Sequence, residues 1–140
     1  MRVLKLILPF LLFFLLIECS GPNEVKQEIS QNDVQRKGWV IRLKPGKLKD
    51  YKDLHKKVWP GILKKLKEVN IRNYTIFYRD GLLFSYFEYT GNNFAADMNK
   101  MAVDSLTQEW WKLTNPCQEP IKTAGEGVWW ADMEEVFHMD

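Results

Sequence analysis

Apolar and polar positions begin to alternate at Gly38, after a stretch of mostly polar residues. Trp39, Ile41 and Leu43 fall on one side of an extended chain, which is the two-residue period of a β-strand. The Pro45-Gly46 pair that follows ends the strand, because proline lacks a backbone N–H and glycine favours turns. This segment is predicted to be the first strand of the domain.

A period of three to four residues replaces the alternation between Leu48 and Val69. That spacing places the apolar residues on one face of a helix. Pro60 lies inside the run, and proline is tolerated in the first turn of a helix but breaks its interior. We therefore expect a kink, or the start of a new helix, at Trp59-Pro60. The apolar face consists of Leu48, Tyr51, Leu54, His55, Val58, Trp59, Ile62, Leu63, Leu66 and Val69.

Two β-rich runs joined by Asp80-Gly81 predict a hairpin, because Asp-Gly is a strong signal for a tight two-residue turn. The first run covers residues 74–78 and the second covers residues 82–89. Both faces of these runs are largely apolar. The hairpin is therefore expected to be central in its sheet and covered on both sides.

A second helix is predicted to begin at about Asn93, with Trp110 and Trp111 at or just beyond its end. A loop rich in Pro, Gly and Thr over residues 115–127 then leads to a last strand at about residues 134–139. The apolar face of this helix consists of Phe94, Met98, Met101, Ala102 and Leu106.

The order strand, helix, two strands, helix, strand predicts an α+β fold of the ferredoxin-like type. Such a fold has one antiparallel sheet with both helices on one face. The other face of the sheet would be bare, although apolar residues of the hairpin point to both sides. We expect a second copy of the chain to cover that face, which predicts a homodimer.

The first nineteen residues have the pattern of an export signal. Arg2 and Lys5 precede a twelve-residue apolar run, which is shorter than the roughly 20 residues of a membrane-spanning helix. Leu16, three positions before Cys19, resembles the lipobox of bacterial lipoproteins, although Glu18 stands where those proteins prefer a small residue. The resemblance implies cleavage before Cys19 and attachment of lipid to its sulfur. Ordinary secretion and an uncleaved anchor are the alternatives.

The chain is thus divided into residues 1–19 as a signal peptide, 20–37 as a polar tether and 38–140 as one domain. We expect the protein to be exported and lipid-anchored on the periplasmic side of a bacterial membrane. Contact with the membrane would be made only through that N-terminal lipid.

Charge and composition exclude two classes of partner. The net charge of +2 over 140 residues gives no basic footprint for nucleic acid. His55 and His138 are the only histidines, and Cys19 and Cys117 are the only cysteines. No pair among them has the spacing of metal ligands, so no metal site is expected.

Tyr51, His55 and Trp59 stand four residues apart, so on a helix they lie along one face. A histidine between two aromatic rings is partly desolvated. Its ordinary pKa near 6.5 suits giving and taking protons at neutral pH. The alternative is a hydrogen-bonded histidine at the edge of the core.

Other aromatic residues suit the mixed surface of a monosaccharide. Tyr74 and the Trp110-Trp111 pair offer flat apolar faces with a polar handle, although packing in the core is the alternative for each. Glu88 is expected to point inward, as a second acid/base group or one half of a buried salt bridge. His138 is interpreted as a strand-end or interface residue. The residues alone therefore predict a small-molecule pocket with acid/base chemistry.

Five segments, in chain order, resemble the L-rhamnose mutarotase family. The resemblance extends over about residues 38–140. The segments are the stretch from Tyr51 through His55 to Val58-Trp59-Pro60, then Asn73-Tyr74-Thr75-Ile76, Leu82-Leu83-Phe84, Gln108-Glu109-Trp110-Trp111 and Met133-Glu134-Glu135-Val136-Phe137-His138.

The resemblance implies a dimeric isomerase that interconverts the α and β anomers of L-rhamnose or a similar deoxysugar without a cofactor. His55 would be the proton donor, and Tyr51, Tyr74 and the Trp110-Trp111 pair would contact the substrate. Gly61 departs from the family, which usually has Glu after Trp-Pro. The absent carboxylate would serve as a sugar contact, a support for the histidine or a surface charge. A non-catalytic sugar-binding lipoprotein and a small dimeric ferredoxin-like oxygenase are the alternative functions.

Overall fold

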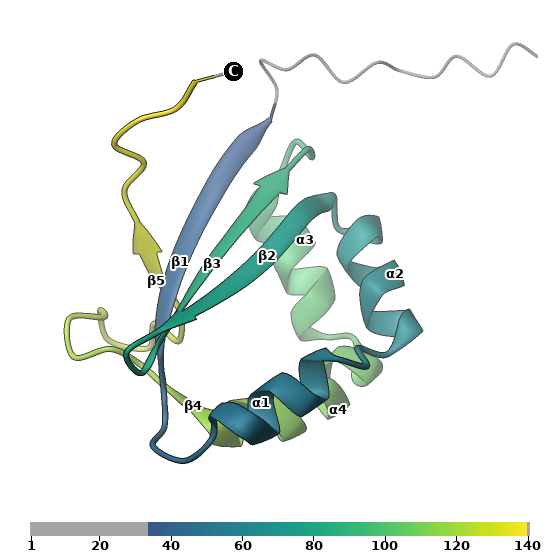
Figure 1. The fold of residues 1–140 in the computed structure, drawn as a ribbon. Coiled ribbons are helices and arrows are strands. Elements are labelled where there is room, and N and C mark those ends of the chain that lie inside the picture. Colours follow the sequence, from purple (N-terminus) through teal and green to yellow (C-terminus); the bar gives the residue numbers. More distant parts are fainter. Residues whose placement is uncertain (1–33, 140) are drawn as a thin grey trace, which may run out of the picture.

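The computed structural model describes residues 34–139, so the predicted signal peptide, the lipidation site Cys19 and most of the tether lie outside the described residues. Five strands form one antiparallel sheet in the order β2-β3-β1-β4, and β5 also pairs with β1 (Figure 1). Their bounds are β1 Gln35–Leu43, β2 Ile71–Arg79, β3 Leu82–Tyr89, β4 Gln118–Glu119 and β5 Ala131–Met133.

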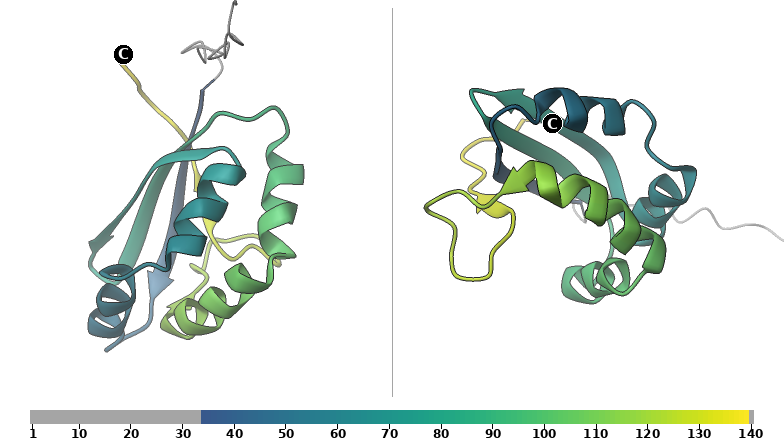
Figure 2. Two further views of the ribbon diagram at one scale, coloured as in Figure 1. Left: turned by 90° about the vertical axis from the view of Figure 1, so that its right-hand side faces the viewer. Right: turned by 90° about the horizontal axis from the view of Figure 1, so that it is seen from below.

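Helices pack against one face of this sheet (Figure 2). They are α1 Leu48–His55, α2 Pro60–Glu68, α3 Phe94–Ala102 and α4 Ser105–Thr114, followed by a short 3-10 turn over Asn115–Cys117. The order of the strands and the placement of the helices confirm the predicted ferredoxin-like α+β architecture. Within residues 34–139, no helix has the length and apolar character needed to cross a membrane.

The predicted break at Trp59-Pro60 is confirmed. The backbone of Trp59 is extended, with φ −61° and ψ 134°, and α2 begins at Pro60, because proline disfavours a helical conformation in the preceding residue. The hairpin turn is confirmed as well. Asp80 and Gly81 both have positive φ, 49° and 78°, as the type I′ turn of a two-residue hairpin requires.

The predicted second helix is in fact two helices. Asp104 separates α3 from α4, and its carboxylate accepts a hydrogen bond from the backbone N–H of Thr107 at 2.9 Å. This is an N-cap, which satisfies a donor that the first turn of a helix leaves free. The prediction for Trp110 and Trp111 is therefore wrong, since both lie inside α4 and not at the end of a helix.

The predicted last strand at residues 134–139 is also wrong. The last strand is β5, which ends at Met133, just before the predicted range. The chain then continues beside β1 without strand pairing (Figure 1). Met133 pairs with Gly38, so β1, which starts at Gln35, has few residues left to pair with a longer strand. The ion pair between Arg36 and Glu135, at 2.8 Å, joins the C-terminal segment to β1 instead.

The hairpin is only partly central, because β2 forms an edge of the sheet and β3 lies inside it. The side of β3 that faces the helices is fully enclosed, with Leu83, Phe87 and Tyr89 at 1% exposure or less. On the opposite side, which we call the outer face, Phe84 is half-buried and Phe77 is 62% exposed. Within the described residues of one chain, the outer face is left uncovered, as expected, and its coverage by a second copy stays a prediction.

Candidate functional site

The last turn of α1 holds His55 in a defined orientation. Its imidazole ring lies 4.2 Å from the Tyr51 ring, centroid to centroid, at 31° between planes. His55 Nδ1 is 2.9 Å from the backbone oxygen of Tyr51. A carbonyl oxygen only accepts hydrogen bonds, so Nδ1 carries the proton and donates. Nε2 is therefore the nitrogen left to exchange a proton with a ligand.

Burial sets the charge of this imidazole. Desolvation lowers the pKa of His55 below its ordinary 6.5, and the hydrogen bond to the Tyr51 carbonyl opposes that effect in part. Burial disfavours the charged imidazolium because the low-polarity surroundings solvate it poorly. At neutral pH the ring is consequently a neutral base whose Nε2 lone pair is available.

Trp110 of α4 is the second aromatic neighbour of His55. The two rings meet edge to face, with centroids 5.5 Å apart, and Trp110 is 6% exposed. Trp59 was expected to flank His55 on the same helix face, which is wrong because α1 ends at His55. Trp59 instead contacts Trp110 at 5.4 Å. Trp111 is half-buried and takes part in none of these ring contacts among the described residues.

The sheet contributes hydroxyl groups to the same region. Tyr74 packs edge to face on Phe87, with centroids 5.5 Å apart. About a third of its side chain is exposed, but burial of the hydroxyl raises the pKa of Tyr74 to about 12, an effect that Ser85 partly offsets. Burial and the nearby Tyr74 hydroxyl also raise the pKa of Tyr51. Both phenols therefore stay protonated and neutral near pH 7.

Three residues of this region escaped prediction from the sequence. Ser85 is buried on the side of β3 that faces the helices, and its Oγ lies near the Tyr74 hydroxyl without a well-formed hydrogen bond to any described residue. Gln118 is 3% exposed and donates from Nε2 to the Tyr51 hydroxyl at 3.2 Å. Trp129 donates from its indole N–H to Gln118 Oε1 at 3.4 Å. Gln118 and Trp129 lie in a segment without periodicity, and Ser85 is one polar residue in an apolar strand, so no sequence signal marked them.

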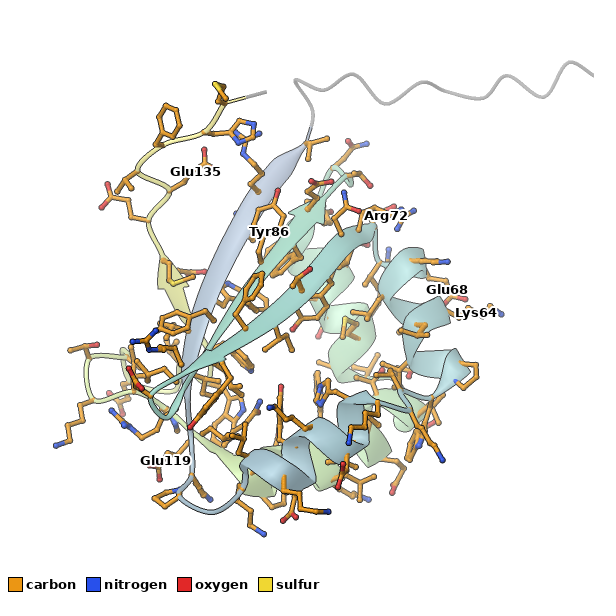
Figure 3. All side chains as sticks on the ribbon, viewed as in Figure 1. Lys64, Glu68, Arg72, Tyr86, Glu119 and Glu135 are labelled. Atoms are coloured by element: carbon orange, nitrogen blue, oxygen red, sulfur yellow. The ribbon has the colours of Figure 1, made fainter. Side chains whose placement is uncertain are left out.

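Glu88 is not part of this site. Its carboxylate accepts hydrogen bonds from Asn73 Nδ2 at 2.6 Å and from the Tyr86 hydroxyl at 3.1 Å. Side chains alternate along a strand, and Phe87 and Tyr89 take the side of β3 that faces the helices. Glu88 therefore lies on the outer face, on the same side of β3 as Tyr86, which is labelled in Figure 3. The expectation that Glu88 points inward as a second acid/base group is wrong.

A sequence profile of the L-rhamnose mutarotase family matches residues 36–139. The chain belongs to this family. An L-rhamnose mutarotase from Oceanobacillus iheyensis is 33% identical over 115 residues, which cover 76% of this chain and 100% of the relative. One from Bacillus subtilis is 31% identical over 109 residues, with coverage of 76% and 100%.

Two solved structures have the same fold as this chain. The crystal structure of an L-rhamnose mutarotase from Formosa agariphila superposes with a TM-score of 0.60 at 22% identity and covers 76% of this chain and 99% of its own. Tetracenomycin F2 cyclase from Streptomyces glaucescens gives 0.56 at 15% identity. Family membership confirms the predicted enzyme class, a sugar mutarotase among the isomerases, and favours it over the non-catalytic alternative.

Gly61, where the resemblance leads us to expect Glu, lies where α2 meets α4. A β-carbon added at Gly61 would collide with the Cδ2 methyl of Leu106. Leu106 is 40% exposed at the start of α4. A side chain at position 61 would therefore begin at the packing contact between the two helices.

Proposed function

We propose that the protein interconverts the α and β anomers of L-rhamnose and that His55 transfers the proton. One observation carries the proposal. The hydrogen bond to the Tyr51 carbonyl fixes Nδ1 as a donor and leaves Nε2 as the reactive nitrogen of a half-buried imidazole between two aromatic rings. A group of this kind gives and takes protons near neutral pH without a metal or a nucleophile.

Ring opening of a hemiacetal takes a proton from the anomeric hydroxyl and delivers one to the ring oxygen. Neutral His55 accepts the first proton at Nε2, and the imidazolium that forms then holds a proton for the ring oxygen. The open-chain aldehyde rotates about the C1–C2 bond and closes again on either face. Closure reverses both proton transfers, so the protein ends in its starting state.

Aromatic and hydroxyl groups around His55 suit a 6-deoxy sugar. Trp110 and Tyr74 would pack against the apolar face and the methyl group, and the Ser85 hydroxyl would meet a sugar hydroxyl. One methyl-sized difference is worth only about 1–3 kcal/mol. We therefore expect a preference for L-rhamnose over other sugars that is graded and not absolute.

Anomer exchange measured by saturation-transfer NMR tests this function. The wild-type protein should accelerate exchange of L-rhamnose above the rate in buffer, and His55→Ala should return it to that rate. His138→Ala is the matched control, since it removes the other histidine and should leave the rate unchanged. Fucose, galactose and xylose in the same assay rank the preference. Tight binding of one anomer without faster exchange would overturn the proposal in favour of a binding protein.

A homodimer formed through the outer face is part of the proposal. Phe77 is 62% exposed there, and the C-terminal segment exposes Val136, Phe137 and Met139 at 78% or more. Exposed apolar side chains favour association. Light scattering at micromolar concentration should return twice the chain mass for the wild type and one chain mass for Phe77→Glu. A wild-type monomer at that concentration would contradict this part.

Export with lipid attached to Cys19 completes the proposal, on the support of the sequence pattern alone. A mutarotase on the periplasmic side of the membrane would act on sugar released there by glycoside hydrolysis. Labelling of cells with a fatty-acid analogue should mark the wild-type chain and leave Cys19→Ser unmarked. Labelling that survives the substitution would rule out Cys19 as the lipid site.

A further inference from the structure

Gln118 is a buried polar residue with two side-chain partners, and no part of the proposed mechanism uses it. It begins β4, directly after the 3-10 turn, and is 3% exposed. We infer that Gln118 is a positioning residue that fixes the Tyr51 hydroxyl as a hydrogen-bond donor to the sugar. This inference rests on the proposed function, because it specifies how the same site holds its substrate.

The direction of the two hydrogen bonds follows from the chemistry of the groups. The indole N–H of Trp129 can only donate, so the atom of Gln118 that faces it at 3.4 Å is the amide oxygen. The amide nitrogen must then face Tyr51, where it donates to the phenol oxygen at 3.2 Å. Trp129 thereby selects which end of the amide reaches Tyr51.

This direction decides where the Tyr51 proton points. The phenol oxygen already accepts from Gln118, and among residues 34–139 its own hydrogen has no acceptor. Burial raises the pKa of Tyr51, so the group keeps that hydrogen. A buried hydroxyl without an acceptor costs free energy, and an oxygen of a bound sugar would relieve that cost.

The same tyrosine also orients the proton-transfer group. Its backbone oxygen holds His55 Nδ1 at 2.9 Å, and its ring stacks on the imidazole at 4.2 Å. A sugar oxygen bound to the Tyr51 hydroxyl is therefore placed relative to His55 through one rigid residue. Gln118 acts on substrate through Tyr51 and does not touch the reacting atoms in this arrangement.

Gln118→Glu reverses the hydrogen bond while keeping the shape of the side chain. A carboxylate accepts from both Trp129 and Tyr51, so it would take the hydrogen that the sugar requires. Burial raises the pKa of a carboxyl, so the comparison is made at a pH high enough to ionise it, where we expect anomer exchange of L-rhamnose to fall about tenfold or more relative to wild type. As the pH falls and the carboxyl protonates, it can donate to Tyr51 as the amide does, so the ratio of variant to wild-type rate should recover.

Gln35→Glu is the matched control, because it makes the same change at an exposed residue at the opposite end of β1 from β4. The ratio of its exchange rate to that of the wild type should stay near one at every pH. Tyr51→Phe introduces no new charge in the interior, and its exchange rate should fall by a comparable factor. The double variant with Gln118→Glu should then exchange the anomers only slightly more slowly than Tyr51→Phe alone. Circular dichroism checks that each variant is folded.

The two proposals fail in different ways in this experiment. No exchange by the wild type sinks the proposed function, and titration calorimetry with L-rhamnose then tests Gln118 by the same pH-dependent ratio of binding constants. A ratio near one at all pH values overturns the inference about Gln118. A loss of rate or binding in Gln118→Glu that is the same at every pH also overturns it, because a merely structural role would produce that result. An absence of L-rhamnose binding to the wild type overturns it as well.

Discussion

Tyr89→Phe should destabilise the fold more than its single missing oxygen atom suggests. Tyr89 is completely buried, and its hydroxyl donates to Asp97 Oδ2 at 2.8 Å and accepts from the backbone N–H of Asn93 at 2.9 Å. Asn70 Nδ2 and Lys100 Nζ, each at 2.7 Å, are the other partners of Asp97. This network ties the end of β3 to the start of α3 and to the turn before β2.

The size of the loss follows from the two bonds that the hydroxyl makes. A hydrogen bond to a charged group contributes about 1.5–3 kcal/mol and a neutral one about 0.5–1.5 kcal/mol. Phenylalanine keeps the ring but leaves the Asn93 N–H without its partner. We expect a loss of about 2–4 kcal/mol in the free energy of unfolding. A domain of this size loses about 4–8 °C in Tm for each kcal/mol.

Urea denaturation followed by far-UV circular dichroism measures this change. Tyr86→Phe is the matched control on the same strand, since its half-buried hydroxyl makes one bond, to Glu88 at 3.1 Å on the outer face. That variant should lose less stability than Tyr89→Phe, because water can replace its one hydrogen bond on the partly exposed outer face. Equal losses in the two variants, or less than about 1 kcal/mol in Tyr89→Phe, would refute the reasoning.

Three further predictions concern charge and packing. The hydrogen-bond partners of Asp97 lower its pKa to about 2. Its contribution to stability is therefore complete above the unfolded pKa of about 3.9 and is lost as the pH falls towards 2. Urea midpoints measured against pH should show this dependence for the wild type and not for Asp97→Asn. Gly61→Ala should stabilise the chain by up to about 0.5–1 kcal/mol through helix propensity, because the atom in the way is the terminal methyl of Leu106, which is 40% exposed and can rotate aside. A loss of stability that disappears in a Leu106→Ala background would contradict this prediction. Because burial lowers the pKa of His55, the acid limb of the kcat/KM profile should lie below pH 6.5, and a limb above that value would contradict a neutral base.

Local signals in the sequence accounted for much of the fold. Asp80-Gly81 predicted its turn and Pro60 predicted the start of α2, because both act through the conformation of one or two residues. Asp104 was missed even though aspartate is a common N-cap, since apolar residues continue at helical spacing on either side of it. The extent of β5 depends on where β1 starts, which residues 131–139 do not encode.

The candidate site was predictable only where its residues lie on one helix. The spacing of Tyr51 and His55 was sufficient to stack their rings, and the break before Pro60 removed Trp59 from the stack. Gln118, Trp129 and Ser85 come from distant segments and meet Tyr51 and Tyr74 only through the fold. Glu88 was assigned to the wrong side because both sides of β3 are apolar, so alternation could not tell the inner face from the outer.

Exchange between the anomers of L-rhamnose at neutral pH, measured by saturation-transfer NMR for wild type and His55→Ala side by side, tests the central claim most directly. We expect fast exchange with the wild type and the buffer rate with a folded His55→Ala. Exchange as fast in His55→Ala as in the wild type would show that the proton moves through another group.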